Sequence, residues 1–214
     1  MAAAKASNLK GIPRRSTLDT AKAVFAQHGG TLSAMAAIRM GVHPATLYRM
    51  RDEGEIVQIS RGLYRLATLP PLSNPDLVHV ALRAPKGVIC LVSALSFHDL
   101  TTQIPHEVSI ALPYGYRPPR LDHPPLRVFR FSGKALSEGV QTHEIDGFRV
   151  RVYCPEKTIT DCFRFRGKIG SDVAIEALKA YCRRKGARVD DLLRYARICR
   201  VEKVMQPYLE AALA

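Results

Sequence analysis

Residues 31–66, TLSAMAAIRMGVHPATLYRMRDEGEIVQISRGLYRL, constrain the fold more than any other part of the sequence. His43 and Pro44 predict the start of a helix, because proline suits a first helical turn in which its missing N–H is not needed. Gly54 follows where a left-handed helix cap is expected. Two short β-type runs then flank Gly62, in a glycine-containing hairpin connection. A short helix, a turn, a second helix and a two-stranded ribbon form the order of a winged helix-turn-helix.

The second helix of this stretch has two different faces. Leu47 and Met50 point to one side and are expected to seal the helix onto a core. At about 100° per residue, Ala45, Tyr48 and Arg49 face outward. They lie in the first half of the helix, the end that enters a DNA major groove in this class of domain. The pattern therefore predicts a recognition helix.

Each outward residue type has a chemical reason to meet DNA. Arg49 suits a guanine edge, Thr46 and Tyr48 suit phosphate or base, and Ala45 is small enough to contact a thymine methyl group. The ribbon adds side chains placed to touch the backbone or the neighbouring minor groove. The expected DNA-binding residues are Ser33, Arg39, His43, Ala45, Thr46, Tyr48, Arg49, Gln58, Ser60, Arg61 and Arg65. The alternative is a solvated, mildly basic face on an ordinary small domain.

Charge is unevenly distributed along the 214 residues, whose net charge is +13. Residues 1–68 carry ten Lys and Arg against four Asp and Glu, residues 69–150 carry eight against seven, and residues 151–214 carry fourteen against eight. Two basic ends around a near-neutral middle are expected if both ends approach a polyanion. The alternative is charge that serves solubility alone.

The sequence predicts an α+β protein with an N-terminal winged helix-turn-helix, followed by a mixed α+β domain with a helical C-terminus. We expect a disordered basic arm at residues 1–15, the winged domain at 16–68, a proline-containing linker at 69–75 and the second domain at 76–214. Ser16 and Asp19 form a capping-box pattern at the start of a helix.

Several signals organise the second domain. Asp146-Gly147 between two alternating runs is a strong hairpin signal. Ser93 and Ser171 are expected to cap helices, and Pro207 is expected to kink or break the last helix.

The cysteines and histidines do not form a metal-binding pattern. The five cysteines are scattered without C-x-x-C spacing, which favours reduced thiols and predicts neither disulfides nor a metal or other cofactor. No apolar run approaches the roughly 20 residues that span a bilayer. We therefore expect a cytoplasmic protein with no membrane partner.

No catalytic residue is predicted. A restriction-type nuclease needs an acid two residues before a lysine, and the chain has no such pair. Ser96, His98 and Asp99 are near neighbours on one expected helix, so their side chains point in different directions and cannot form a relay. Glu156 is instead expected to begin a helix, and Lys157 to pair with Asp161 four residues on.

The C-terminal segment suggests a second basic surface, as a phosphate-binding face or a dock for an acidic protein, with a solvated helix face as the alternative. Its continuity requires one helix to run through Arg200. The candidate residues are Arg183, Arg184, Lys185, Arg188, Arg194, Arg197 and Arg200.

Three blocks of sequence resemble one known family. SALSFHDLTTQIPHEVSIAL at residues 93–112, the ribbon GEIVQISRGLYRL and VYCPEKTITDCFRFRGKIG at residues 152–170 resemble motifs of AbiEi-type antitoxins. The resemblance implies an antitoxin and transcriptional autorepressor, whose winged domain binds inverted repeats of double-stranded DNA. It also implies a nucleotidyltransferase toxin as partner, in a type IV toxin–antitoxin system of phage defence.

Other functions remain open from the sequence. One is a stand-alone regulator without a toxin, and another is a nucleic-acid-processing enzyme that a winged domain delivers. A third is an interaction protein whose basic tail binds an acidic partner. A single domain offers few base contacts, so we expect a monomer in solution or a weak dimer on DNA.

Overall fold

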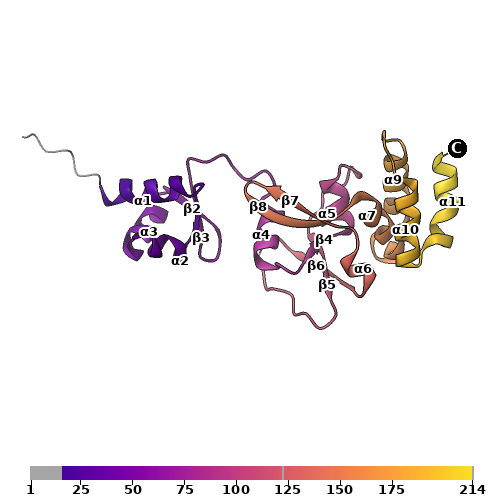
Figure 1. Cartoon of the computed structure of the whole chain (residues 1–214), viewed down its shortest axis with the longest axis horizontal. Helices are drawn as coiled ribbons and strands as arrows, with labels where there is room; N and C mark the ends of the chain where they lie inside the picture. Colours follow the sequence, from indigo (N-terminus) through magenta and orange to yellow (C-terminus); the bar gives the residue numbers. More distant parts are fainter. Residues whose placement is uncertain (1–15, 122, 214) are drawn as a thin grey trace, which may run out of the picture. The chain divides into compact units, whose positions relative to one another are not determined.

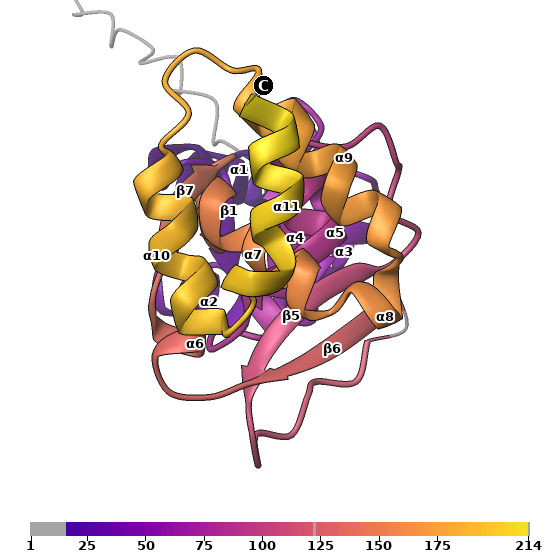
Figure 2. The ribbon, with the colours of Figure 1, turned by 90° about the vertical axis from the view of Figure 1, so that its right-hand side faces the viewer.

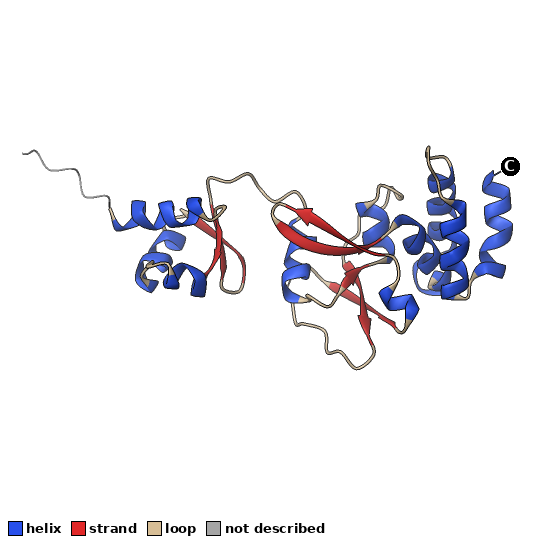
Figure 3. Cartoon of the chain, in the orientation of Figure 1, coloured by secondary structure: helices blue, strands red, loops and turns tan. Residues whose placement is uncertain are grey.

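The computed structural model describes residues 16–121 and 123–213, and these divide into two compact units, one ending at Pro71 and one beginning at Leu72. Helices and strands are mixed in both, and the strands fall into two separate sheets (Figures 1 and 3). The expected α+β class is therefore confirmed. The arm expected at residues 1–15 lies outside the described residues.

The first unit contains three helices and three strands within its described residues. They are α1 (Thr17–Gln27), β1 (Thr31–Ser33), α2 (Ala34–Arg39), α3 (Pro44–Asp52), β2 (Ile56–Ser60) and β3 (Leu63–Leu66). The strands form an antiparallel sheet in the order β1-β3-β2. The ribbon expected from the sequence is present, but β1 was not expected, because three residues are too short to show an alternating pattern.

Local signals and a small core explain this arrangement. Ser16 caps α1 in a capping box, in which its hydroxyl accepts a hydrogen bond from Asp19 N at 3.1 Å. Phe25 of α1, Leu47 and Met50 of α3 and Ile56 of β2 are all buried in one cluster. These apolar contacts hold α3 against α1 and the sheet, and they fix which of its faces stays exposed.

The second unit is built on a five-stranded mixed sheet in the order β6-β5-β4-β8-β7. The strands are β4 (Val88–Ile89), β5 (Val108–Pro113), β6 (Leu126–Phe131), β7 (Val140–Ile145) and β8 (Phe148–Tyr153). The expected hairpin joins β7 to β8 through Asp146 and Gly147, both with positive φ. The helices are α4 (Pro75–Arg83), α5 (Leu91–Phe97), α6 (Lys134–Ser137), α7 (Pro155–Arg164), α8 (Arg166–Ile169), α9 (Ser171–Cys182), α10 (Val189–Cys199) and α11 (Glu202–Leu213).

The sheet separates two apolar clusters. On one side, Val78 of α4 packs with Val150 and Val152 of β8. On the other, Phe131 and Tyr153 pack against the helical C-terminal part, where α7 contacts α5, α9, α10 and α11. Figure 2 shows α9, α10 and α11 gathered together. Helix α7 is therefore the centre of this unit, and all its side chains from residue 156 to 163 are buried.

Two local expectations for the second unit were wrong. Ser93 does not cap a helix, because α5 begins at Leu91 and the buried Ser93 hydroxyl accepts a hydrogen bond from Ser109 N. Ser171 is the first residue of α9 and makes no cap hydrogen bond. At Pro207 a kink or a break was expected, and α11 runs through this residue without a break. Among the described residues, no helix combines the length and apolar character that crossing a bilayer requires.

Candidate nucleic-acid interface

The inner face of α3 and its first turn hold the helix in place. The His43 ring caps the helix, because its Nδ1 accepts a hydrogen bond from Ala45 N at 3.2 Å, and Pro44 follows at the first helical position. Leu47 and Met50 are buried beneath the helix. The sequence signals for the start of this helix and its buried side were therefore correct.

The outer face of α3 is open to solvent. Ala45 is exposed, Tyr48 is 53% exposed and the Arg49 side chain is 62% exposed. Thr46 lies at the flank, half-buried, where it lines a hollow of about 200 Å³ together with residues of α1 such as Thr17 and Thr20. The exposed strip thus offers a small apolar residue, a phenol and a guanidinium.

Carboxylates on the same helix neutralise part of this strip. Arg49 Nε donates to Glu53 Oε1 at 2.7 Å, and Arg51 makes a 2.7 Å ion pair with Asp52. The hydrogen bond to Asp52 raises the pKa of Arg51 above its usual value, and the Arg51 guanidinium lies 5.3 Å from the centre of the Tyr48 ring. Arg49 is therefore paired through Nε with a carboxylate just after the helix, and Arg51 is paired with one on the helix.

The β2–β3 hairpin places a second group of side chains. Gln58 and Arg61 are exposed, with Arg61 at the turn beside Gly62. Arg65 is half-buried and donates to Pro70 O at 3.2 Å. Ser60 is buried at 7% exposure, which contradicts its expected contact with DNA. We therefore remove Ser60 from the interface.

Of the three remaining candidates, Ser33 and His43 cap helices and Arg39 lies at the end of α2. The Ser33 hydroxyl caps α2, because it accepts a hydrogen bond from Ala36 N at 3.1 Å, and the His43 ring caps α3 as described above. Arg39 is exposed at the end of α2. The structure leaves Ala45, Tyr48, Arg49, Gln58, Arg61 and Arg39 as exposed candidates, and the capping residue His43 is exposed as well.

Most arginines of the second basic surface expected near the C-terminus have protein partners. Arg184 donates to the carbonyl oxygens of His98 and Asp99, both at 2.6 Å. Ion pairs join Arg188 to Glu156 at 2.8 Å, Arg194 to Asp191 at 3.1 Å and Arg197 to Glu202 at 2.9 Å. Arg183 and Lys185 remain exposed after α9.

The basic residues near the C-terminus do not form the expected continuous stripe, because the helix ends before Arg200. Helix α10 ends at Cys199, and Arg200 adopts the left-handed conformation with φ of 58°. The chain turns there before α11 begins. Residues that follow Arg200 are therefore not on the same helical face as Arg194 and Arg197.

The centre of the second unit contains a buried ionic cluster. Lys157 and Asp161 form the expected pair, with Nζ and Oδ2 2.5 Å apart and both side chains fully buried. Burial alone would raise the pKa of Glu156, but hydrogen bonds from Tyr181 and Arg188 outweigh it and leave that pKa below its usual value. Lys157 pairs with Asp161 and Glu156 pairs with Arg188 through Oε1, whereas the buried Oε2 of Glu156 has no hydrogen bond among the described residues. These pairs indicate that the cluster supports the fold.

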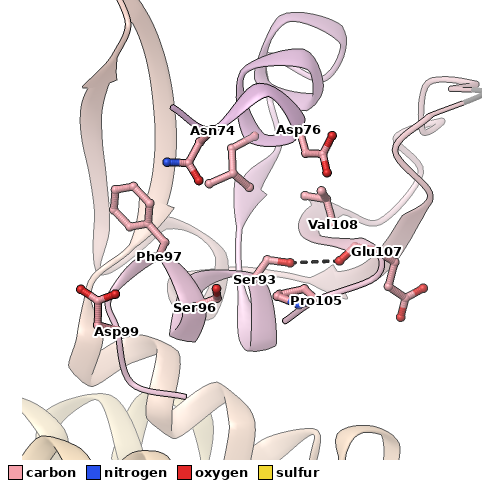
Figure 4. Close-up of a pocket in the computed structure, with 10 residues that line it drawn as sticks. Asn74, Asp76, Ser93, Ser96, Phe97, Asp99, Pro105, Glu107 and Val108 are labelled. Atoms are coloured by element: carbon pink, nitrogen blue, oxygen red, sulfur yellow. Dashed lines mark hydrogen bonds between the residues drawn. The ribbon is translucent and has the colours of Figure 1, made fainter. Parts of the chain in front are cut away.

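A hollow of about 310 Å³ in the second unit is the other candidate site (Figure 4). Ser93, Ser96, Asp99 and Glu107 are among its lining residues. The Ser93 hydroxyl donates to Glu107 O at 3.3 Å and accepts from Ser109 N at 2.9 Å, so it is already engaged. His98 is not among the lining residues, and its Nε2 bonds Tyr153 O at 2.7 Å. The hollow does not assemble a serine, a histidine and an acid.

The described residues hold no group of three His, Cys, Asp or Glu side chains arranged to bind a metal ion. The geometry of the first unit therefore offers the clearer site, an exposed polar strip on an anchored helix beside a basic hairpin.

Comparison with known proteins bears on the first unit. Residues 19–67 match the profile of a family described as "Transcriptional regulator, AbiEi antitoxin". The match covers less than a quarter of the chain and leaves out the motifs at residues 93–112 and 152–170. No curated protein matches the chain. The comparison confirms the resemblance seen in the ribbon: from α1 to the end of β3, this chain is similar to the AbiEi antitoxin family of transcriptional regulators.

Proposed function

We propose that the protein is a sequence-specific DNA-binding transcriptional regulator that uses its first unit as a winged helix-turn-helix. In this proposal α3 is the recognition helix and the β2–β3 hairpin is the wing. The observation that carries the proposal is the pair of faces on α3. Leu47 and Met50 anchor it, while Ala45, Tyr48 and Arg49 stay exposed. The family match over residues 19–67 supports the same function.

The chemistry of the exposed strip fits a major groove. Arg49 has the planar fork that binds O6 and N7 of guanine, and Ala45 suits a thymine methyl group. The Tyr48 hydroxyl suits a phosphate, and Arg61 at the hairpin turn suits the backbone or minor groove beside it. The Arg49–Glu53 pair is exposed at both ends, so the exchange of Glu53 for a base edge costs little.

One domain supplies few base contacts, so the proposal includes a second copy on an inverted repeat. The protein would be a monomer in solution and pair on its operator, in the cytoplasm beside the promoter it controls. Bound copies repress by occupancy, because they exclude polymerase. The finer proposal is an autorepressor and antitoxin whose partner is a nucleotidyltransferase toxin of a phage-defence system. It rests on the resemblance of the sequence motifs and on the family's description.

Footprinting and binding titrations on the DNA upstream of the protein's own coding sequence test the regulator. We expect protection of two related half-sites. Arg49→Ala should weaken binding to that duplex by about 1–3 kcal/mol without loss of fold. The matched control is Arg183→Ala, which removes an exposed cation after α9. Equal binding of the upstream duplex and of a random duplex by the wild-type chain would contradict sequence-specific regulation.

A stand-alone regulator without a toxin is the second candidate, because the family match is confined to the first unit. Co-expression with the product of the adjacent gene separates the two. An antitoxin restores growth that the neighbouring product inhibits, and Arg49→Ala should retain that rescue if neutralisation is independent of DNA binding. A regulator alone leaves the growth of such cells unchanged.

A further inference from the structure

The β7–β8 hairpin of the second unit borders a small hollow that contains two arginines. The hollow measures about 280 Å³ and is lined by Ala81, Ala84, Pro85, Gly87, Thr142, Arg149 and Arg151. We call it the basic hollow. Arg149 and Arg151 come from β8, Thr142 from β7, and the remaining residues from α4 and the turn after it.

The sequence of β8 explains why the two arginines share one face. In FRVRVY, side chains alternate across the sheet, and Val150 and Val152 are fully buried against α4. Arg149 and Arg151 alternate with these valines and are not part of that core: Arg149 is exposed and Arg151 is half-buried. The β-ladder places Thr142 directly across from Arg151. The arginine positions are about 7 Å apart along the strand, at roughly 3.4 Å per residue.

Neither arginine is neutralised within the described residues. No ion pair within 4.0 Å joins Arg149 or Arg151 to a described carboxylate, although Glu144 lies across from Arg149 in the ladder. Arg151 uses Nη1 to donate to Lys86 O at 3.3 Å, which fixes the guanidinium and leaves its other N–H groups available. The lining contains no acid.

Another hollow of the same unit allows a comparison of how two neighbouring arginines are paired. Arg188 and Arg194 also line a hollow together, but Asp191 lies in that lining and pairs with both of them. Arg188 is further held by Glu156. Two arginines that share a hollow are thus neutralised at one place and left uncompensated at the other. The uncompensated pair is the one suited to an external anion.

We propose that the basic hollow binds a phosphate group. Two guanidinium groups on one face present planar donors that match phosphate oxygens, and the Thr142 hydroxyl can donate a further hydrogen bond. The ligand is either a phosphate of a nucleic-acid backbone or a small phosphorylated molecule. The site belongs to the second unit and uses no residue of the proposed recognition helix, so it goes beyond the proposed function.

The first experiment titrates the full-length, ¹⁵N-labelled chain with inorganic phosphate and follows the arginine Nε–Hε signals. We expect saturable shifts of the Arg149 and Arg151 signals, and loss of this response in Arg149→Ala/Arg151→Ala. The absence of saturable shifts in the wild-type chain would overturn the proposal. Arg149→Lys/Arg151→Lys keeps the charge but not the planar fork, so it tests the geometry if the alanine variant fails to fold. We expect it to bind phosphate at least several-fold more weakly.

A second experiment identifies the source of the phosphate. Binding of a short DNA duplex is measured at several salt concentrations. If backbone phosphates occupy the hollow, the slope of log K against log salt falls by about 0.9 for each contact that the alanine variant loses. An unchanged slope, together with the response to inorganic phosphate, assigns the hollow to a small phosphorylated ligand.

The control variant is Arg183→Ala/Lys185→Ala, which removes the same charge from exposed positions after α9. An equal loss of phosphate response in this variant would show a general charge effect and would overturn the site. The proposed function fails separately. If the wild-type chain shows the phosphate shifts but binds no duplex, the phosphate site is supported and the proposed DNA-binding function fails.

Discussion

Replacing Asp161 with alanine should destabilise the second unit more than any exposed substitution. Asp161 is the partner of Lys157, and both side chains are fully buried in α7. The Lys157 ammonium lies 4.2 Å from the centre of the Tyr153 ring and 5.0 Å from that of Phe131. These rings contribute some cation–π attraction, but neither replaces a carboxylate. The variant therefore leaves a cation in an apolar environment without its counter-ion.

Breaking a buried pair from one side costs about 3–5 kcal/mol, because the remaining charge is left buried without compensation. We therefore expect Asp161→Ala to lower the free energy of unfolding by about 3–5 kcal/mol.

Urea unfolding followed by circular dichroism measures this free energy of unfolding. Lys157→Met/Asp161→Leu removes both charges together and should recover most of the lost stability. Glu202→Ala, which removes the carboxylate 2.9 Å from the exposed Arg197, is the matched control and should cost less than about 1 kcal/mol. A loss below about 1 kcal/mol in Asp161→Ala would refute the reasoning.

Three further predictions follow from single contacts. Glu53→Gln releases Arg49 and removes a negative charge, so duplex DNA should bind more tightly in an anisotropy titration, and weaker binding would contradict this. Ser16→Ala removes the hydroxyl that accepts the hydrogen bond from Asp19 N, and it should lower the free energy of unfolding by about 1 kcal/mol, measured by thermal unfolding. Unchanged stability would rule out a contribution from this cap. The pKa of Glu156 is held below its usual 4.5, so its contribution is present above that pH and is lost as pH falls through the folded value. Glu156→Gln should therefore flatten the decline in unfolding free energy between about pH 6 and 3, and an equally steep decline would exclude this role.

The elements that the sequence predicted correctly depend on neighbours in the chain. The hairpin at Asp146-Gly147, the helix start at His43-Pro44 and the capping box of Ser16 each arise within a few residues. The pairing of Lys157 with Asp161 was predictable for the same reason, because positions i and i+4 lie on one side of a helix.

What could not be predicted depends on distant partners. Strand β1 exists because β3 pairs with it, across a gap of about thirty residues of chain. Ser93 has the residue type of a helix cap, but its hydroxyl bonds to β5, which no local pattern reveals. The basic stripe near the C-terminus is interrupted because Arg200 adopts a left-handed conformation, and Glu156 of α7 and Glu202 of α11 pair with Arg188 and Arg197. The signal for the basic hollow was present in the alternation of FRVRVY, but the absence of a nearby acid became visible only in three dimensions.

The net charge of +13 does not by itself locate a DNA interface, because ion pairs decide which cations are available. Among the described residues of the first unit, the ion pairs join Lys22 to Glu55, Arg49 to Glu53 and Arg51 to Asp52. An exposed pair such as Arg49–Glu53 is worth at most about 1 kcal/mol, whereas a bidentate arginine–guanine contact discriminates by about 1–3 kcal/mol. A guanine at the right position thus displaces Glu53 with a net gain in binding free energy. A weaker contact barely offsets the free energy lost when the Arg49–Glu53 pair breaks. In the proposed interface, the carboxylates on α3 therefore reduce binding to random sequence more than binding to the operator.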